Sequence, residues 1–188
     1  MTPVLRLAAA FALVTLAVGS ASAHPLHGTD FAGGLAHPFM GIDHLLAAVG
    51  VGMWAARLSG RSLWIVPAGF VSAMLVGCAM ALAGYGAGAI EPMTAASVAV
   101  LGALLFWRLR SNAFFAAALV AYFAIFHGMA HAAELSGPAS GFVVGLALST
   151  AALHASGIAA ARHLPAIVPY AGAALTGLGT WWVAASLL

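Results

Sequence analysis

Six apolar segments, each close to the length of a membrane-spanning helix, follow one another along most of the chain. They cover residues 39–57, 63–84, 90–109, 113–135, 138–161 and 165–187, and short breaks such as "RLSGR" and "GYGAG" separate them. An α-helix needs about 20 apolar residues to cross the hydrocarbon core of a bilayer. The breaks are too short to hold a soluble domain. The sequence therefore predicts an all-α integral membrane protein, with residues 39–188 forming one six-helix transmembrane bundle.

The scarcity of charge excludes several classes of protein. Of the 188 residues, 64% are hydrophobic and 5% are charged, whereas soluble domains have about 25% charged residues. The six basic residues form no patch of the kind that binds nucleic acid. The glycine-rich "GYGAG" lacks the lysine of a phosphate-binding loop, so direct coupling to ATP hydrolysis is not expected. Cys78 is the single cysteine and cannot form an intramolecular disulfide.

The N-terminus has the three parts of a cleavable signal peptide. Arg6 precedes an apolar stretch at residues 7–18, and Ala21 and Ala23 flank Ser22 in a small-residue cleavage site. The alternative is an uncleaved first transmembrane helix. We predict a signal peptide at residues 1–23, followed by a short histidine-containing periplasmic segment at residues 24–38. The protein is then expected in a bacterial inner membrane, with its mature N-terminus in the periplasm.

Arginine positions predict the same orientation independently. The first, third and fifth breaks between the apolar segments contain or adjoin every arginine after the signal peptide, namely Arg57, Arg61, Arg108, Arg110 and Arg162. Basic residues are enriched in cytoplasmic loops of membrane proteins. These three loops are therefore expected in the cytoplasm, which leaves the mature N-terminus outside.

The stretch "HPFMGIDH", residues 37–44, places ionisable side chains where the first apolar segment begins. Such residues are costly inside a bilayer and usually functional. His37 and His44 are seven residues apart, about two helical turns, which predicts nearly the same face of one helix. Asp43 is expected either to orient a metal-binding imidazole or to complete a site with a neighbouring helix.

A second group lies in "FHGMAHAAE", residues 126–134, near the end of the fourth segment. His127 and His131 are four residues apart, so they share one face of a helix and can bind one ion together. Glu134 lies about 10 Å along the axis from His127, too far for all three to bind one ion from a regular helix. Two readings stay open: a two-histidine site supported by Glu134, or successive stations along a path.

The two groups of residues are expected at similar depths in the membrane. Counted from the periplasmic ends of their helices, Asp43, His44 and His131 are expected at similar shallow depths, with His127 one turn deeper and His154 deeper still. Imidazoles and carboxylates suit borderline divalent cations such as Ni²⁺, Co²⁺, Zn²⁺ or Cu²⁺. The pattern favours a line of metal ligands running from the periplasm toward the centre of the bundle.

Three further residues are weaker candidates. Glu91 begins the third segment and is expected either to stabilise the helix dipole or to bind metal at the periplasmic mouth. After cleavage, His24 would carry both an α-amine and an imidazole, with His27 nearby. These two histidines either capture metal ahead of the membrane or belong to a polar tail.

On these motifs the chain resembles the HupE/UreJ family of bacterial nickel permeases. That family has an HPxxGxDH-type motif in its first helix and an FHGxAHGxE-type motif in its fourth; this chain departs at Ala132, where glycine is common. The resemblance implies uptake of Ni²⁺, sometimes Co²⁺, as cargo of a permease rather than as a bound cofactor. It also implies a link to metal chaperones for hydrogenase or urease maturation. Its metal-handling residues would be His37, Asp43, His44, His127, His131 and Glu134, with Glu91 less firmly included.

Two other classes of function remain. A zinc-dependent membrane hydrolase also presents two histidines four residues apart, but Gly128 stands where such enzymes carry a glutamate base, and Glu134 would have to replace it. A metal-binding accessory or sensor subunit would bind metal without moving it. The oligomeric state is not predicted.

Overall fold

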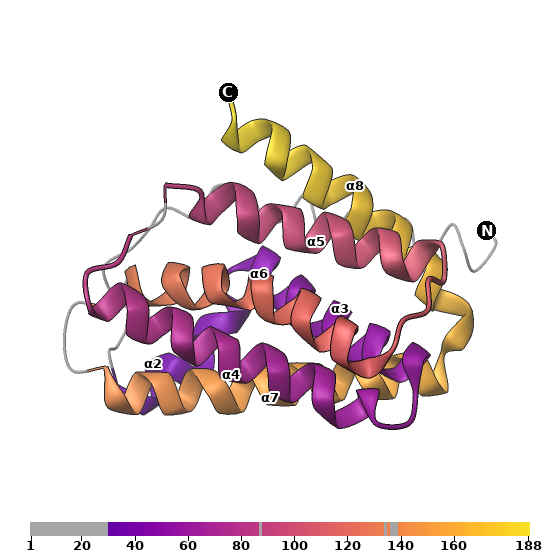
Figure 1. The fold of residues 1–188 in the computed structure, drawn as a ribbon, viewed down its shortest axis with the longest axis horizontal. Helices are drawn as coiled ribbons and strands as arrows, with labels where there is room; N and C mark the ends of the chain where they lie inside the picture. The colour runs from indigo at the N-terminus through magenta and orange to yellow at the C-terminus, as the bar shows by residue number, and fades with distance from the viewer. Residues whose placement is uncertain (1–29, 87, 134, 136–138) are drawn as a thin grey trace.

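A computed structural model describes residues 30–86, 88–133, 135 and 139–188. The predicted signal peptide, His24, His27 and Glu134 lie outside these residues. Every regular element in the described part of the chain is helical, as predicted (Figure 1). The elements are α2 (Phe31–Ala36), η1 (His37–Phe39), α3 (Ile42–Leu58), α4 (Ser62–Leu82), α5 (Ile90–Phe106), α6 (Ala113–Ala133), α7 (Ser140–His163), η2 (Pro165–Ile167) and α8 (Val168–Ser186).

Several of these helices are suited to crossing a membrane. α4, α6 and α7 are long and apolar enough, and the bent pair Phe31–Phe39 and Ile42–Leu58 makes a fourth candidate if it counts as one span. α5 is apolar but shorter, at 17 residues. Because backbone N–H and C=O groups have no water partners in lipid, a continuous helix is the form in which such segments cross it. The chain therefore has the helices of a multi-pass membrane protein.

The start of the first predicted segment differs from expectation. His37 begins the short 3-10 helix η1, with Pro38 next in its first turn, and the helix closes with a hydrogen bond from the Met40 N–H to the His37 carbonyl. Gly41 is extended, and the chain turns by 82° before α3 begins at Ile42. The prediction that His37 and His44 lie on one face of a single helix is therefore wrong. The first helix starts three residues later than expected, and His37 precedes the bend.

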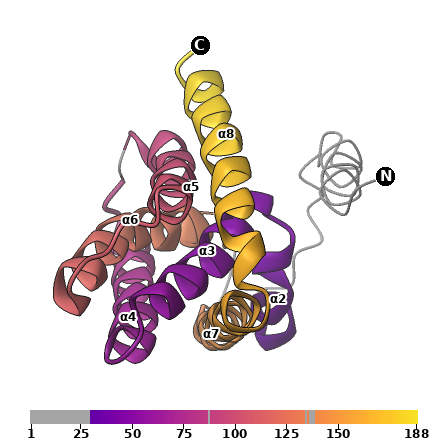
Figure 2. The same ribbon diagram turned by 90° about the vertical axis from the view of Figure 1, so that its right-hand side faces the viewer.

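The six long helices pack largely in pairs, and glycine lets their backbones approach closely (Figure 2). A Cβ added to Gly52 of α3 would collide with the carbonyl oxygen of His154 in α7, and one added to Gly128 of α6 would collide with that of Met74 in α4. Gly102 and Gly172 play the same part between α5 and α8. Small residues at helix contacts are the usual means of packing in lipid, where burial of apolar surface supplies little drive.

α3 is the central helix, because it contacts each of the other five long helices (Figure 2). Its charges suit its dipole, with Asp43 in the first turn and Arg57 in the last. The connections 59–61, 107–112 and 164–167 lie together at one end of the bundle (Figure 1). All five arginines in the described residues are in or beside these connections. The starts of α3 and α5 and the end of α6 lie at the opposite end.

Candidate metal site

Asp43 and His44 form a hydrogen-bonded pair in the first turn of α3. His44 Nδ1 lies 2.7 Å from Asp43 Oδ1, and the two side chains are 14% and 30% exposed, respectively. A carboxylate only accepts hydrogen bonds, so Nδ1 of His44 carries the hydrogen and Nε2 keeps its lone pair. Of the two arrangements considered for Asp43, the structure contains the one in which it orients the neighbouring imidazole. This carboxylate–histidine contact is common behind metal-binding imidazoles.

Four histidine rings from three elements touch one another in series. His131 of α6 lies 4.8 Å from His37 of η1 and 4.2 Å from His44 of α3, measured between ring centroids. His44 in turn lies 4.9 Å from His127 of α6. The bend after η1 is what brings His37 to His131, from a different direction than a straight helix would allow. The histidines of "HPFMGIDH" and of "FHGMAHAAE" therefore face each other where the start of α3 lies beside the end of α6.

His154 of α7 lies beyond this series. Its Nδ1 is 2.7 Å from the carbonyl oxygen of Ala48, and because a carbonyl only accepts, Nδ1 is the protonated nitrogen. Its Nε2 is buried and has no hydrogen-bond partner among the described residues. The ring of Phe70 lies between the two histidines, 5.6 Å from His127 and 5.0 Å from His154. Phe70 was not singled out from the sequence, where it is one phenylalanine among ten.

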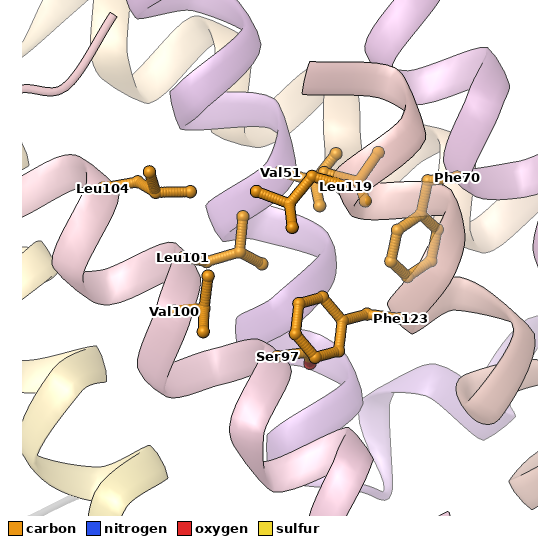
Figure 3. A pocket seen from close by; sticks show the side chains of 9 residues that line it. Val51, Phe70, Ser97, Val100, Leu101, Leu104, Leu119 and Phe123 are labelled. Carbon is orange, nitrogen blue, oxygen red and sulfur yellow. The ribbon is translucent and has the colours of Figure 1, made fainter. Parts of the chain in front are cut away.

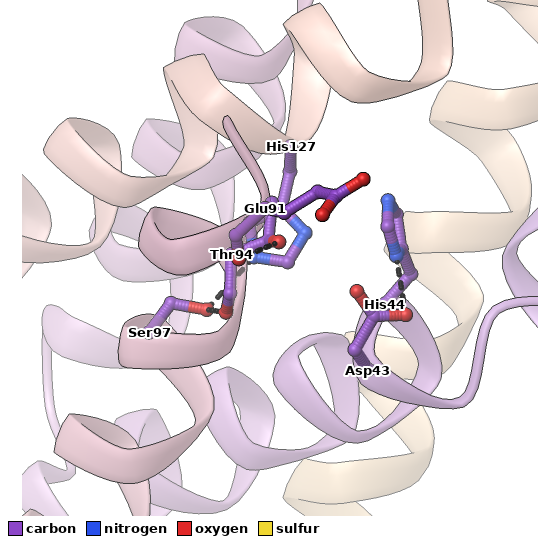
Figure 4. A network of polar contacts seen from close by, with 6 residues as sticks. All are labelled: Asp43, His44, Glu91, Thr94, Ser97 and His127. Carbon is purple, nitrogen blue, oxygen red and sulfur yellow. Dashed lines mark hydrogen bonds and ion pairs between the residues drawn. The ribbon is translucent and has the colours of Figure 1, made fainter. Parts of the chain in front are cut away.

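α5 adds a polar stripe that reaches His127 (Figure 4). Glu91, Thr94 and Ser97 are three residues apart and so follow one side of the helix. Ser97 Oγ lies 2.8 Å from His127 Nε2 and donates to the Thr94 carbonyl at 2.6 Å. Sequence reasoning included Glu91 but missed Thr94 and Ser97. Their spacing in an apolar helix was a visible signal, although small hydroxyl residues also occur in such helices for packing alone.

Two spaces adjoin these residues. An open cleft of about 390 Å³ is lined by α3, α5 and α8, with Asp43, Glu91 and Thr94 at its wall. A much smaller apolar cavity of about 10 Å³ lies further along α5 (Figure 3). It is about large enough for a single water molecule. Ser97 and Phe70 line this cavity together with leucine and valine side chains. Thr94 borders the cleft and Ser97 the cavity, so the polar stripe of α5 connects the two.

The donor groups are spread along a line. In the described residues, no three histidine, cysteine, aspartate or glutamate side chains are placed so as to hold one metal ion. The order from the cleft is Asp43 with His44, then His127 with Ser97, then Phe70 and His154, while His131 and His37 branch from His44. Each ring therefore contacts its neighbours, and within the described residues none belongs to a three-ligand centre.

The fold and this interior line of imidazoles define a multi-pass membrane protein that carries buried histidine rings between its helices. The HupE / UreJ protein family model matches residues 12–185. The chain is also 41% identical over 150 residues to Protein HupE of Rhizobium leguminosarum bv. viciae, a match that covers 78% of each chain. The chain belongs to the HupE/UreJ family, which confirms the resemblance of its two motifs. No solved structure matches it.

Proposed function

We propose that this protein is an inner-membrane permease that moves a divalent transition-metal ion, Ni²⁺ or else Co²⁺, from the periplasm to the cytoplasm. The observation that carries the proposal is the series of contacts between the rings of His37, His131, His44 and His127 in the interior of the bundle. Imidazole and carboxylate ligands suit these borderline cations. The HupE/UreJ family is associated with nickel and cobalt uptake for hydrogenase or urease.

The orientation follows from the arginines. In this proposal α3 to α8 all cross the membrane, and the arginine-bearing connections face the cytoplasm, where basic loops are enriched. The cleft lined by Asp43 and Glu91 is formed by the opposite ends of α3, α5 and α8. It therefore opens to the periplasm. Two carboxylates in the mouth of a path attract a divalent cation before any ligand binds it.

The ion then moves between ligands in steps. At the Asp43–His44 pair the ion exchanges some of its bound water for an imidazole nitrogen. The rings of His131 and His127 both contact the His44 ring. His154, whose Nε2 has no hydrogen-bond partner among the described residues, is the next ligand toward the cytoplasm. Paired rather than three-ligand contacts favour release, because conduction needs binding strong enough to enter and weak enough to leave.

The membrane potential can drive this movement without ATP. One elementary charge crossing 100 mV gains about 2.3 kcal/mol, so a divalent cation gains about 4.6 kcal/mol. That free energy sustains a concentration ratio on the order of 10³. The protein then acts as a secondary transporter or channel-like permease and not as an enzyme, and the ion that it imports supplies metal chaperones for hydrogenase or urease.

Three residues outside the described part of the chain complete the proposal. Glu134, three residues after His131 in the same motif, serves as a further ligand near the periplasm. His24 and His27 follow the proposed signal peptide and capture metal ahead of the cleft. These roles rest on the sequence motifs and on the family.

The deciding experiment is radiometal uptake by the purified protein in liposomes. ⁶³Ni²⁺ is supplied outside, with an inside-negative potential and with unlabelled Co²⁺, Zn²⁺ or Cu²⁺ as competitors. The proposal predicts protein-dependent accumulation that rises with the potential and that Ni²⁺ or Co²⁺ competes best. Saturable metal binding without accumulation would instead support an accessory or sensor subunit. Hydrolytic activity without accumulation would support the zinc-dependent hydrolase.

A further inference from the structure

Ser97 is the middle member of a short hydrogen-bond chain that joins His127 to the carbonyl oxygen of Thr94. The side chain is fully buried, and its Oγ donates to the carbonyl oxygen of Thr94 in the same helix at 2.6 Å. The same Oγ lies 2.8 Å from Nε2 of His127 (Figure 4). A hydroxyl has one hydrogen to donate, and a carbonyl oxygen accepts hydrogen bonds but never donates them. With that hydrogen given to Thr94, Ser97 Oγ accepts a hydrogen bond from Nε2–H of His127.

We propose that Ser97 is a positioning residue that holds His127 in its Nε2–H tautomer, so that Nδ1 is the nitrogen that meets the transported ion. A neutral imidazole has one protonated nitrogen and one with a lone pair, and only the latter binds a metal. Which nitrogen is free is set by the hydrogen bond that the other one makes. The metal role of Nδ1 rests on the permease function proposed above.

The two rings nearest the cleft are then arranged to complement each other. In Figure 4 the second nitrogen of His127 lies on the side of its ring that faces His44 and Asp43. His44 uses its Nδ1 for the bond to Asp43, which leaves Nε2 with the lone pair. Asp43 and Ser97 therefore act on neighbouring rings, 4.9 Å apart, from opposite sides. Each of the two rings then offers the ion a single nitrogen, Nε2 of His44 and Nδ1 of His127.

Packing alone does not account for the contact between Ser97 and His127. Buried serines in membrane helices satisfy their hydroxyl by donating to a carbonyl one turn back. Ser149 of α7 does this with Leu146 at 3.1 Å, and its Oγ also lies 3.5 Å from the carbonyl oxygen of Gly34, with no hydrogen bond to a histidine in the described part of the chain. Ser97 has the same bond to its own helix, so its contact with His127 serves the histidine and not the serine. Ser149 is therefore a matched control, because it is buried and helical and its hydroxyl contacts carbonyl oxygens instead of a histidine ring.

The tautomer can be measured without metal and without transport. The protein is labelled with ¹⁵N-histidine, placed in lipid bilayers at pH 8 and studied by solid-state NMR, with the His127 signals assigned by their loss in His127→Asn. We expect Nε2 of His127 to be the protonated nitrogen in the wild type and in Ser149→Ala. In Ser97→Ala we expect a new signal from the Nδ1–H tautomer, and in Ser97→Thr, which keeps the hydroxyl, the wild-type pattern.

Uptake of ⁶³Ni²⁺ by the same variants tests the metal role. Replacing a group that orients a metal ligand costs about 10–100-fold in affinity, so Ser97→Ala should raise KM at least about 10-fold, with Ser97→Thr restoring it. A wild-type His127 protonated at Nδ1, an unchanged tautomer in Ser97→Ala, or an altered tautomer with unchanged KM would each overturn the inference. If the wild type accumulates no metal, the permease function fails, while the NMR result still decides whether Ser97 sets the tautomer.

Discussion

The rings of His44 in α3 and His131 in α6 lie 4.2 Å apart, the closest pair of histidine rings in the described residues. They come from the two separate motifs and approach each other at an interplanar angle of 62°. A contact of this kind joins a ring oriented by a carboxylate, on His44, to a ring that is 3% exposed, on His131. The pair is the point at which the two motifs become one site.

Replacing His131 tests whether the buried ring handles metal. His131→Ala removes the ring that touches both His37 and His44, so we expect ⁶³Ni²⁺ uptake in liposomes to fall about 10-fold or more. His163→Ala, at the exposed end of α7, is the matched control and should behave as the wild type. Normal uptake by His131→Ala would remove His131 from the proposed path.

Asp43→Asn tests the orienting carboxylate with almost no change in size. The amide loses the negative charge that faces His44 Nδ1 and that lines the cleft, so both ligand orientation and ion attraction weaken. We expect KM for Ni²⁺ to rise about 10–100-fold. Initial rates of uptake across a range of ion concentrations measure this change. An unaltered KM would show that Asp43 supports the fold and not the ion.

The close packing of α4 on α6 predicts that substitutions at two glycines, Gly128 and Gly177, change stability by very different amounts. Gly128→Val places a side chain against the carbonyl oxygen of Met74, which belongs to backbone and cannot move aside. We expect a loss of about 1–3 kcal/mol in stability, the usual cost of overpacking. Gly177→Ala, which has open space around it in α8, should be neutral or slightly stabilising. Thermal unfolding in detergent compares the two, and equal midpoints would contradict the packing.

External acid should slow uptake. An imidazole binds a metal only when it is deprotonated, and histidine changes its charge between pH 5 and 8. Protonation of the histidines that water reaches at the periplasmic end therefore removes lone pairs there and adds positive charge that repels the ion. We expect uptake to fall as the external pH drops from 7 to 5, measured with the membrane potential held constant by a potassium gradient and valinomycin. A steady rise over the same range would argue against histidine stations.

The proposed capture of metal by the N-terminus predicts an effect confined to scarce metal. The double variant His24→Ala and His27→Ala should lower uptake at low Ni²⁺ concentration and leave it unchanged at saturating Ni²⁺, because the membrane path is intact. Uptake by whole cells at both concentrations measures this. Equal uptake by the variant and the wild type at low concentration would assign these residues to a polar tail.

Much of the architecture is determined by the sequence. Runs of about 20 apolar residues have one means of satisfying their backbone in lipid, the helix, so their number and order can be read without tertiary information. The predicted segment 113–135, for example, ends within two residues of α6, which is Ala113–Ala133. Helical periodicity likewise places His127 and His131 on one face. The two motifs were sufficient to indicate the family.

The contacts that make the site were decided by the tertiary structure. Periodicity describes one helix at a time, and it failed at Gly41, where an extended residue turns the chain by 82° and carries His37 to His131. The hydrogen bond between Ser97 and His127 joins residues 30 positions apart, and the position of Phe70 between His127 and His154 depends on three helices packing together. These contacts depend on which helices pack together, and helices pack closely where a glycine lets two backbones approach. That pairing is a property of the assembled bundle and cannot be read from one segment alone.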